Sequence, residues 1–342
     1  MGFKNLTLAA SSLSAVHAPL IEHIRSGLIT HIETSGLRGE LAEQISRGLM
    51  DFPVVFRSHG GRASAIRSGE LHIDVAFLGA PSCDPYGNAN GYSRDDDDGI
   101  SCGSLGYART DAEFADKVII ITNNIVSYPN APWAIPEHDV DYVVRVDDIG
   151  DPKGIMSGAT RYTKDPKELL IAKTAANVVE AAGYLYDGFS MQMGSGGASL
   201  ATARFIRQKM LDKGIRCRFA LGGITGQITA MHEEGLIDRI LDVQSFDLDA
   251  AKSLKNNHFH HQISATYYAS HLVATAAEQL DFVILSALEI DTDFNVNVLT
   301  GSDGVIRGAI GGHPDTAESA SLAVIVAPLV RGRIPTVVEH VG

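Results

Sequence analysis

A glycine-rich turn is the first place in this sequence where chemistry is expected. The apolar run 189–193 ends in Gly194-Ser195-Gly196-Gly197, and an amphipathic stretch follows at once. Strand, glycine loop and helix is the arrangement by which nucleotide-binding proteins present backbone N–H groups to a phosphate. The loop is therefore a candidate binding site, and the alternative is a tight strand-to-helix turn without a ligand.

A dinucleotide is the obvious ligand for such a loop, but the pattern fits it poorly. The fingerprint needs Gly or Ala where Ser199 stands, and an acidic residue at the end of the next strand to bind the ribose. That strand, "RCRFAL", instead ends in Gly222-Gly223. An NAD(P)-binding oxidoreductase of the Rossmann type therefore remains only an alternative.

A second glycine-rich segment, "GSDGVIRGAIGGHPDTA", covers residues 301–317. It contains Gly308, Gly311, Gly312 and Asp315. Successive backbone N–H groups in such a segment can form a nest that binds a carbonyl oxygen as it becomes an oxyanion. The first part of the chain holds a related loop, "GISCGSLGYARTD", which favours a function. The alternative is a surface hairpin loop.

Cations gather in the segment 56–69, "FRSHGGRASAIRSG", which contains Arg57, His59 and Arg62. The chain carries a formal net charge of −13, so a local cationic cluster is a candidate site for a polyanionic substrate. The alternative is a helix N-terminus with ordinary surface arginines.

No metal site is predicted. The histidines of "NNHFHHQ" (256–262) lack a Cys or H-E-x-x-H partner, and we expect them at the surface. The four aspartates 95–98 are expected in a solvated loop that could hold a cation adventitiously. Cys83, Cys102 and Cys217 are widely spaced, so we predict reduced thiols and a cytosolic protein.

Composition excludes several classes of function. The acidic balance argues against a general nucleic-acid binder. No run reaches the roughly 18 apolar residues that span a bilayer, and the N-terminus does not resemble a signal peptide. We therefore expect no nucleic-acid partner and no membrane insertion.

The elements that must position these loops follow from hydrophobic patterning. Nine apolar runs typical of strands covered on both faces alternate with helical patterns such as "GELAEQISRGLM" and "ITAMHEEGLIDRIL". This alternation predicts an α/β fold with mainly parallel sheets. The runs are "NLTLAAS", "PVVFRS", "DVAFLGA", "KVIIITN", "YVVRV", "FSMQM", "RFALGG", "FVILSA" and "LAVIVAPLV".

An internal repeat predicts two copies of one unit. Segment 74–90 aligns without gaps on segment 281–297, at an offset of 281 − 74 = 207, and six identical residues match, among them Asp84 with Asp291. We predict domains 1–164 and 165–342, joined near a helix that Asp165 caps and Pro166 opens. The first copy begins at the counterpart of "RCRFAL", so it lacks an opening strand and glycine loop.

The chain resembles the alpha subunit of bacterial citrate lyase, a citrate CoA-transferase, essentially from end to end. The most specific stretches are "SHGGRASAIRSGELHIDVAFLGAPSCDPYGNANG", "GSGGAS", "ALGGIT", "LDVQSFD", "SALEIDTDFNVNVLTGSDGVIRGAIGGHPDTA" and "PLVRGRIPT". The resemblance implies two tandem CoA-transferase-like domains. It also implies that the chain is a piece, because the family is longer at both ends.

The reaction that the resemblance implies exchanges citrate for acetate on the CoA-like thiol of an acyl-carrier protein, with acetyl-CoA as a stand-in. No tightly bound cofactor is expected. The implied partners in an oligomeric complex are a beta (lyase) subunit and a gamma (acyl-carrier) subunit. Citrate, citramalate and malonate cannot be told apart as acceptors from the sequence, and a non-catalytic scaffold remains an alternative.

Site residues can be assigned on this basis. Backbone N–H groups of Gly196-Gly197 and Gly311-Gly312 are the candidates for stabilising oxyanions. Many related enzymes use a glutamate nucleophile where Gly222-Gly223 stand, so we predict direct transfer through a mixed anhydride, with an adduct at Glu289 as the alternative. The residues assigned to substrate binding are Arg57, His59, Arg62, Gly194, Ser195, Gly222, Gly223, Asn295, Asn297, Gly308 and Asp315.

Overall fold

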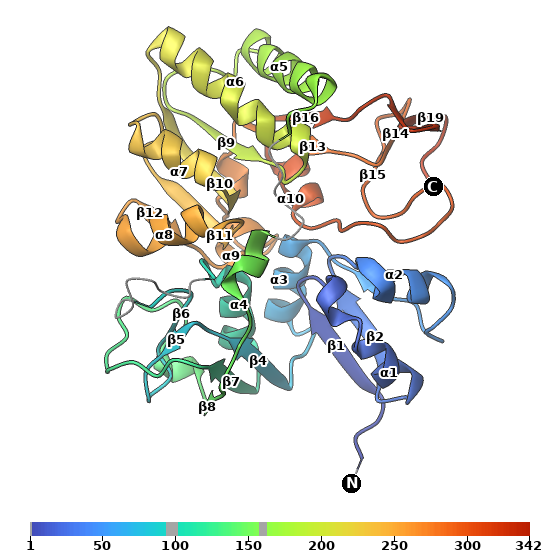
Figure 1. Cartoon of the computed structure of the whole chain (residues 1–342), viewed down its shortest axis with the longest axis vertical. Helices are drawn as coiled ribbons and strands as arrows, with labels where there is room; N and C mark the ends of the chain where they lie inside the picture. Colours follow the sequence, from blue (N-terminus) through green and yellow to red (C-terminus); the bar gives the residue numbers. More distant parts are fainter. Residues whose placement is uncertain (1, 94–101, 157–162) are drawn as a thin grey trace.

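The computed structural model describes residues 2–93, 102–156 and 163–342. Two α/β lobes lie one above the other, and the chain runs from the lower lobe into the upper one (Figure 1). The lower lobe contains β1 (Leu6–Ala10), η1 (Ala15–His17), α1 (Leu20–Arg25), β2 (Ile29–Thr34), α2 (Gly39–Ser46), β3 (Val55–Phe56), α3 (His59–Ser68), β4 (Val75–Gly79), β5 (Ser82–Cys83), β6 (Ala89–Asn90), α4 (Gly106–Phe114), β7 (Lys117–Thr122), η2 (Glu137–Asp139), β8 (Tyr142–Arg145) and η3 (Pro152–Met156).

The remaining elements build the upper lobe and the C-terminal segment beside it. They are α5 (Pro166–Ala181), β9 (Phe189–Met193), α6 (Gly197–Lys213), β10 (Cys217–Ile224), α7 (Gly226–Glu233), β11 (Ile240–Ser245), α8 (Leu248–Asn256), β12 (His260–Gln262), α9 (Ala265–Ala269), η4 (Ala277–Gln279), β13 (Phe282–Ser286), β14 (Glu289–Asp291), β15 (Val296–Asn297), α10 (His313–Ser319), β16 (Leu322–Val326), β17 (Val330–Arg331), β18 (Ile334–Pro335) and β19 (Val337–Val338).

The upper lobe is built on a six-stranded parallel sheet in the order β12-β11-β10-β9-β13-β16. The chain starts at β9, moves to one side through β10, β11 and β12, and then returns to continue through β13 and β16 on the other side. Ligands of open parallel sheets bind at such a reversal, outside the carboxyl ends of the strands. The loop that follows β9 therefore stands where the fold favours a site.

The lower lobe repeats this order without a counterpart of β9 among its described residues, and it adds β8 at one edge. Its parallel strands form two separate sheets, β1-β2-β3 and β4-β7-β8. By their order along the chain and in the sheets, β1, β2 and β3 correspond to β10, β11 and β12, while β4 and β7 correspond to β13 and β16. The described part of the lobe contains no strand in the place of β9, so its sheet is divided there.

The hydrophobic core of the upper lobe explains why its central strands are apolar throughout. Phe189 and Phe282 stack at 5.5 Å between ring centroids and are fully buried. Residues of α5 and α6, such as Val179 and Ile206, cover one face of this sheet. The start of α5 is as predicted, because Asp165 Oδ1 accepts a hydrogen bond of 2.9 Å from Lys167 N and Pro166 opens the helix. The boundary at 164/165 as a domain division stays a prediction.

The predicted α/β class with mainly parallel sheets is confirmed, with corrections in detail. The expectation that all strands are covered on both faces is wrong for β4 and β8, where alternate side chains such as Phe77 and Tyr142 are exposed. The strands β2 and β11 were not predicted, because polar residues interrupt the apolar pattern of their segments. The helical pattern expected over 228–241 ends at Glu233, and β11 begins at Ile240.

The three cysteines are free thiols. Cys83 and Cys217 are buried, and Cys102 is half-buried. Burial raises the pKa of Cys83 to about 12, and nearby Asp84 adds to this shift, so the thiol stays protonated.

Among the helices of the described residues, none has the length and apolar character needed to cross a membrane.

Candidate active site

The glycine loop 194–197 packs directly on the end of β13. Gly194 N donates a hydrogen bond of 2.7 Å to Ile284 O, and a Cβ added to Gly196 would lie 2.7 Å from Ser286 Oγ. Since α6 begins at Gly197, the N–H groups of its first turn have no acceptor within the helix. These N–H groups and the helix dipole give the reversal point of the sheet a partial positive charge.

The second glycine loop reaches the same strand end. His313, the first residue of α10, donates a hydrogen bond of 2.8 Å from Nε2 to Ser286 O. Burial lowers the pKa of His313, and the bond to Ser286 O opposes this only in part, so the ring is neutral at pH 7. Gly311 and Gly312 immediately precede it. The structure therefore brings the two predicted oxyanion loops to one site, at Ser286.

Behind the loops, buried polar side chains link Gly312 to Gly222. Gln192 Nε2 donates a hydrogen bond of 3.0 Å to the hydroxyl oxygen of Tyr268, and a Cβ added to Gly312 would lie 2.5 Å from that oxygen. A Cβ added to Gly222, which has φ +98°, would lie 2.6 Å from the Gln192 carboxamide. Gly223 abuts the ring of Phe246 in the same way. A side chain at position 222 or 223 therefore has no space. The Gln192 amide occupies the position beside Gly222.

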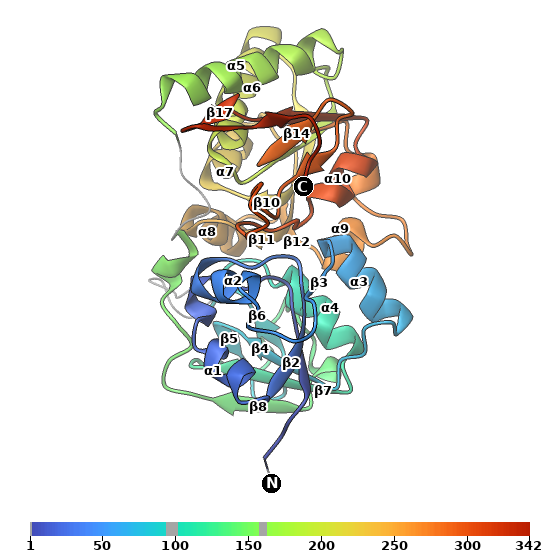
Figure 2. The ribbon, with the colours of Figure 1, turned by 90° about the vertical axis from the view of Figure 1, so that its right-hand side faces the viewer.

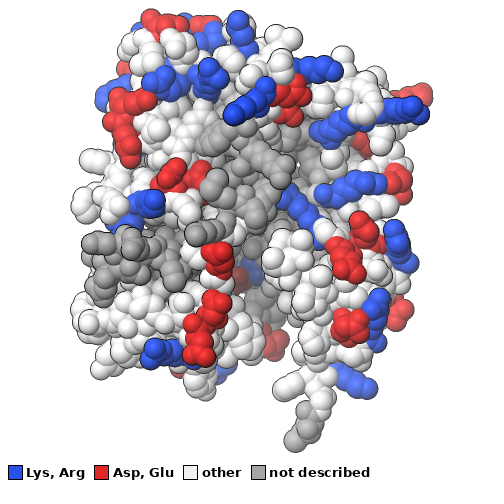
Figure 3. Space-filling model, in the orientation of Figure 1, with Lys and Arg blue, Asp and Glu red and all other residues white. Residues whose placement is uncertain are grey.

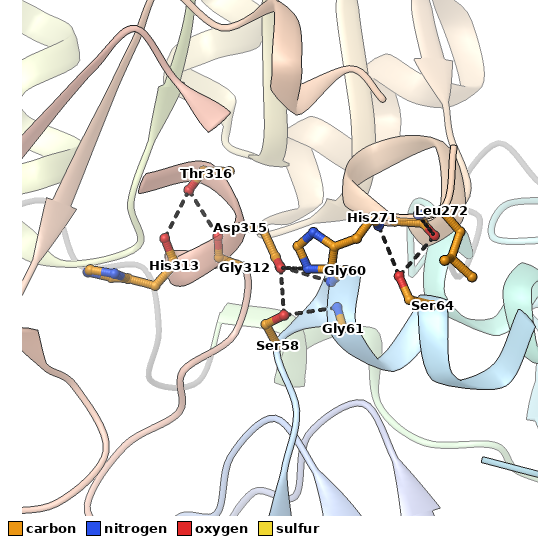
Figure 4. Close-up of polar contacts among 11 residues, drawn as sticks. Ser58, Gly60, Gly61, Ser64, His271, Leu272, Gly312, His313, Asp315 and Thr316 are labelled. Atoms are coloured by element: carbon orange, nitrogen blue, oxygen red, sulfur yellow. Dashed lines mark hydrogen bonds and ion pairs between the residues drawn. The ribbon is translucent and has the colours of Figure 1, made fainter. Parts of the chain in front are cut away.

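The lower lobe meets this site through the N-terminus of α3. Asp315, buried on α10, accepts hydrogen bonds from Ser58 Oγ at 2.5 Å and Gly60 N at 2.8 Å, and His271 Nε2 lies 3.5 Å from it (Figure 4). Burial raises the pKa of Asp315, while the bonds from Ser58 and Gly60 hold it back. A Cβ added to Gly60 would lie 1.9 Å from Ala269 O, so the two lobes are in direct backbone contact.

His59 lies at the same junction. Its backbone N donates a hydrogen bond of 2.9 Å to Gly311 O, and its ring lies 4.4 Å from that of Tyr107. Burial, with Arg62 nearby, lowers the pKa of His59 to about 3. The ring is therefore neutral at pH 7, and its buried Nδ1 has no hydrogen-bond partner.

The two predicted arginines are held by carboxylates of the lower lobe. Arg57 Nε lies 2.6 Å from Glu33 and its Nη2 lies 3.0 Å from Glu70. Arg62 is buried and forms an ion pair of 2.8 Å with Asp111. The structure does not bring either guanidinium into the cluster at Ser286, and their contact with substrate stays a prediction.

The predicted asparagines follow β14, Asn295 in the turn and Asn297 in β15. Asn295 Nδ2 donates to Asp291 Oδ2 at 3.0 Å, and Asn297 Nδ2 donates to Glu289 Oε2 at 3.2 Å. Gly308 lies against this turn, because a Cβ there would be 2.2 Å from Val298 O. These contacts are internal to the chain, so substrate binding by these residues stays a prediction.

Comparison with known proteins identifies the family. The family described as citrate lyase, alpha subunit (CitF), matches residues 1–342. The chain belongs to the citrate lyase alpha subunit family. It is 61% identical to the citrate lyase alpha chain of Haemophilus influenzae over 342 residues, which are 100% of this chain and 68% of that one.

Solved structures agree with this assignment. A Streptococcus mutans citrate lyase alpha subunit, solved in complex with citrate, shares 56% identity and a TM-score of 0.95 over 100% of this chain and 66% of that chain. A 4-hydroxybutyrate CoA-transferase of Porphyromonas gingivalis shares the fold alone, at 16% identity and a TM-score of 0.56 over 97% of this chain and 81% of that chain. The chain spans about two thirds of the length of its citrate lyase relatives.

Several polar groups at the candidate site were not predicted. Gln192 and Ser286 are polar residues inside apolar runs, the first together with Ser190, and this break in each run is the only sequence signal for them. Arg331 donates from Nη2 to Ala287 O, which follows β13. Burial lowers the pKa of Arg331, while the nearby Glu168 favours its charged form. Glu168 in turn lies beside Gly197, because a Cβ there would be 2.7 Å from Oε2.

The surface expectation for the 256–262 histidines is wrong for His260. This side chain is buried, with Nε2 3.0 Å from Asp242 Oδ2 and Nδ1 3.0 Å from Ser253 Oγ. The partner Asp242 lies 18 residues away on a neighbouring strand, so local spacing could not reveal it. Within the described ranges, one exposed group has the geometry to hold a metal ion, His72 with Asp74 and Asp116. The aspartates 95–98 lie outside those ranges.

The distribution of charged side chains on the surface does not mark the site. Figure 3 shows basic and acidic side chains interspersed over the face seen in Figure 1, rather than one basic patch. The assignment of the site therefore depends on the strand ends, the glycine loops and the polar groups between them.

Proposed function

We propose that this chain exchanges acyl groups on a CoA-type thiol, replacing acetate with citrate, and that the reaction occurs at Ser286 between the two glycine loops. The observation that carries the proposal is the convergence of the loops 194–197 and 311–313 on one strand end. Membership of the citrate lyase alpha family supports citrate as the acid, as does the citrate in the S. mutans relative.

The chemistry needs two oxyanions in sequence. A citrate carboxylate attacks the acetyl thioester carbonyl, the C–S bond breaks, and the thiolate leaves with the bonding electrons. The thiolate then attacks the citryl carbonyl of the mixed anhydride, and acetate leaves. Preorganised N–H donors lower each barrier by about 3–4 kcal/mol. Gly196-Gly197 and Gly311-Gly312 are the proposed donors; Gly311 N also donates a long hydrogen bond of 3.5 Å to Ser35 O.

Direct transfer is preferred over a glutamyl-enzyme for a steric reason. Gly222 has a positive φ and lies against Gln192, while Gly223 lies against Phe246. A glutamate at position 222 would displace the buried Gln192, and one at position 223 would displace Phe246. Glu289, the other candidate nucleophile, accepts hydrogen bonds from Asn297 and Ser302.

The remaining expectations about the whole enzyme are part of this proposal. The natural thiol is the CoA-like prosthetic group of a gamma acyl-carrier subunit, and a beta subunit cleaves the citryl thioester. The complex is proposed to be cytoplasmic and to hold no tightly bound cofactor in this chain.

The test measures release of labelled acetate from acetyl-CoA by the 342-residue chain, with and without citrate. We expect release that depends on citrate, and intersecting initial-velocity lines rather than the parallel lines of a ping-pong reaction. A folded chain without citrate-dependent release would instead be a scaffold, and reduction of NAD with a hydroxy acid would make it a dehydrogenase.

Borohydride tests the mechanism separately. The reagent reduces a glutamyl thioester, so after incubation with acetyl-CoA alone mass spectrometry should find every glutamate unmodified. An adduct at Glu289 would overturn direct transfer while leaving the exchange activity in place.

A further inference from the structure

The glycine loop 308–312 of the upper lobe pairs with segment 35–37 of the lower lobe, which directly follows β2. Two backbone hydrogen bonds join the segments, from Leu37 N to Gly308 O at 3.3 Å and from Ile310 N to Ser35 O at 2.8 Å. Between these bonds, Gly36 and Ala309 form an antiparallel bridge. A Cβ added to Gly36 would lie 2.0 Å from Ala309 Cβ, so the two backbones are in direct contact.

Segment 35–37 is itself fixed within the lower lobe. Ser35 N donates a hydrogen bond of 3.2 Å to Ser11 O, and Gly36 O accepts one of 3.0 Å from Leu13 N. The Ser35 side chain is fully buried, and its hydroxyl donates to Ser11 O as well. The loop of the upper lobe is therefore bonded to a support that the lower lobe holds in place on its own.

The lower lobe holds the other end of the loop through residues 58–60, at the start of α3. Asp315, three residues after the loop, accepts hydrogen bonds from Ser58 Oγ at 2.5 Å and from Gly60 N at 2.8 Å (Figure 4). The backbone N–H of residue 59 bonds to the loop itself. Figure 2 shows α3 directly below α9 and α10, at the junction of the lobes. Segment 35–37 and residues 58–60 therefore form a clamp on the loop.

The first copy makes the reciprocal contact with the upper lobe. Gly103, the counterpart of Gly308 at an offset of 308 − 103 = 205, packs on β11, because a Cβ there would lie 2.1 Å from Ser245 Oγ. The neighbouring Ser104 donates a hydrogen bond of 2.7 Å from Oγ to Asp242 O. Each lobe thus contributes a glycine segment that packs on the other lobe, but only the loop 308–312 contains proposed oxyanion donors.

We propose that Gly36 and Ser58 are positioning residues for the transfer reaction, a role that rests on the proposed function. They act through the loop, because the clamp fixes the loop's N–H donors at the strand end marked by Ser286. A glycine-rich loop can otherwise adopt many conformations, and a misplacement of about 1 Å can lower a rate by about a hundredfold. The bond from Gly311 N to Ser35 O involves one of the donors, but at 3.5 Å it is weak. The lower lobe thereby contributes to turnover from behind the loop.

Gly36→Ala tests the clamp directly. The three atoms nearest the new Cβ all belong to residues 308 and 309, and φ at Gly36 is not positive, so the loop rather than Gly36 must move. We expect the Ile310 amide to exchange with solvent about tenfold faster or more. We expect kcat for citrate-dependent acetate release to fall by about a hundredfold. The KM values for citrate and acetyl-CoA should stay within about threefold, because the donors act in the transition state. Gly79→Ala is the control, since no atom lies within 4 Å of its Cβ, and both measurements should be unchanged.

Two serines provide a second matched pair, which decides the matter if Gly36→Ala does not fold. Ser58→Ala removes the bond to Asp315 and should lower kcat by about tenfold, and Ser58→Thr, which retains a hydroxyl, should restore it. Ser104→Ala removes a bond of the reciprocal contact and should keep kcat within about twofold. Equal losses in the two alanine variants, or unchanged Ile310 exchange or kcat in folded Gly36→Ala, would overturn the positioning role while leaving the proposed function intact. A wild-type chain without citrate-dependent release would refute the proposed function, and this role with it.

Discussion

The turns that follow β5 and β14 have almost identical hydrogen bonds, although only the second follows the strand that ends at Ser286. Asp84 Oδ1 accepts from Asn88 N at 3.2 Å and its Oδ2 from Asn88 Nδ2 at 2.8 Å. Asp291 receives the same pair of bonds from Asn295, at 2.9 and 3.0 Å. The repeated Asp and Asn residues therefore specify a turn, and their recurrence is explained without a ligand.

The two copies differ where the proposed chemistry lies. Ser286 corresponds to Gly79 at the offset of 207. At the offset of 205 by which β16 follows β7, His313 corresponds to Ala108 and Gly312 to Tyr107. The lower lobe thus repeats the scaffold but not the polar groups. A residue shared by both copies is expected to affect stability, and a residue found only in the second copy is expected to affect turnover.

Replacing Gly312 by Val should produce the largest effect. The new Cβ would lie 2.5 Å from the Tyr268 hydroxyl, so the loop must move and the oxyanion donor with it. We expect kcat to fall by about a hundredfold or more. Gly154→Val is the control, because no atom lies within 4 Å of its Cβ. Near-normal kcat in folded Gly312→Val would remove this loop from the mechanism.

The paired aspartates test the structural half of the comparison. Asp84→Ala and Asp291→Ala should each lower the free energy of unfolding by about 1.5–3 kcal/mol, the value of hydrogen bonds to a charged group. Urea denaturation measures the loss, and kcat should stay within about twofold in each folded variant. A loss confined to one of the two would contradict the equivalence of the turns.

The same pair makes a prediction about pH. The pKa of Asp84 is lowered: burial would raise it, but hydrogen bonds from Asn130 N, Asn88 and other donors outweigh burial. The pKa of Asp291 is lowered chiefly by the Asn295 side chain. Because folding depresses both values, their stabilisation is present above the unfolded pKa of about 3.9 and is lost as the pH falls through the folded value. Unfolding measured between pH 7 and 3 should show this loss in the wild type and less of it in either alanine variant.

His313 should have a smaller effect, on turnover. His313→Ala removes the donor to Ser286 O, and leaving a buried acceptor unpaired costs about 1–3 kcal/mol, so we expect kcat to fall by about tenfold. His313→Gln can still donate to Ser286 O and should recover part of the rate. Equal rates for both variants would indicate that the imidazole itself acts in the reaction.

Arg57 is expected to matter least. Since Glu33 and Glu70 hold its guanidinium, Arg57→Ala should raise the citrate KM by only about two- to fivefold, and more than it raises the acetyl-CoA KM. Steady-state kinetics with each substrate varied in turn measures the two values. Equal increases would mean that Arg57 acts on the fold alone.

Features that depend on residues close together in the sequence could be predicted, whereas contacts between residues far apart in the sequence could not. The glycine loops, the Asp165 cap and most parallel strands follow from local patterns and were predicted. Gln192, Tyr268 and Arg331 reach the site through contacts between distant strands and loops, which no local spacing records. The same reason explains His260, whose partner Asp242 belongs to the next strand of the sheet.

The bond between Gly60 and Asp315 has a consequence for synthesis on the ribosome. The two residues are 255 positions apart, and at about 5–20 residues per second the acceptor emerges roughly 13–50 s after its donor. Ser58, which accepts from Gly61 N, allows α3 to start in the meantime. The nascent lower lobe must therefore persist for this interval with the Gly60 end of α3 open, and it acquires this contact only after Asp315 has been synthesised.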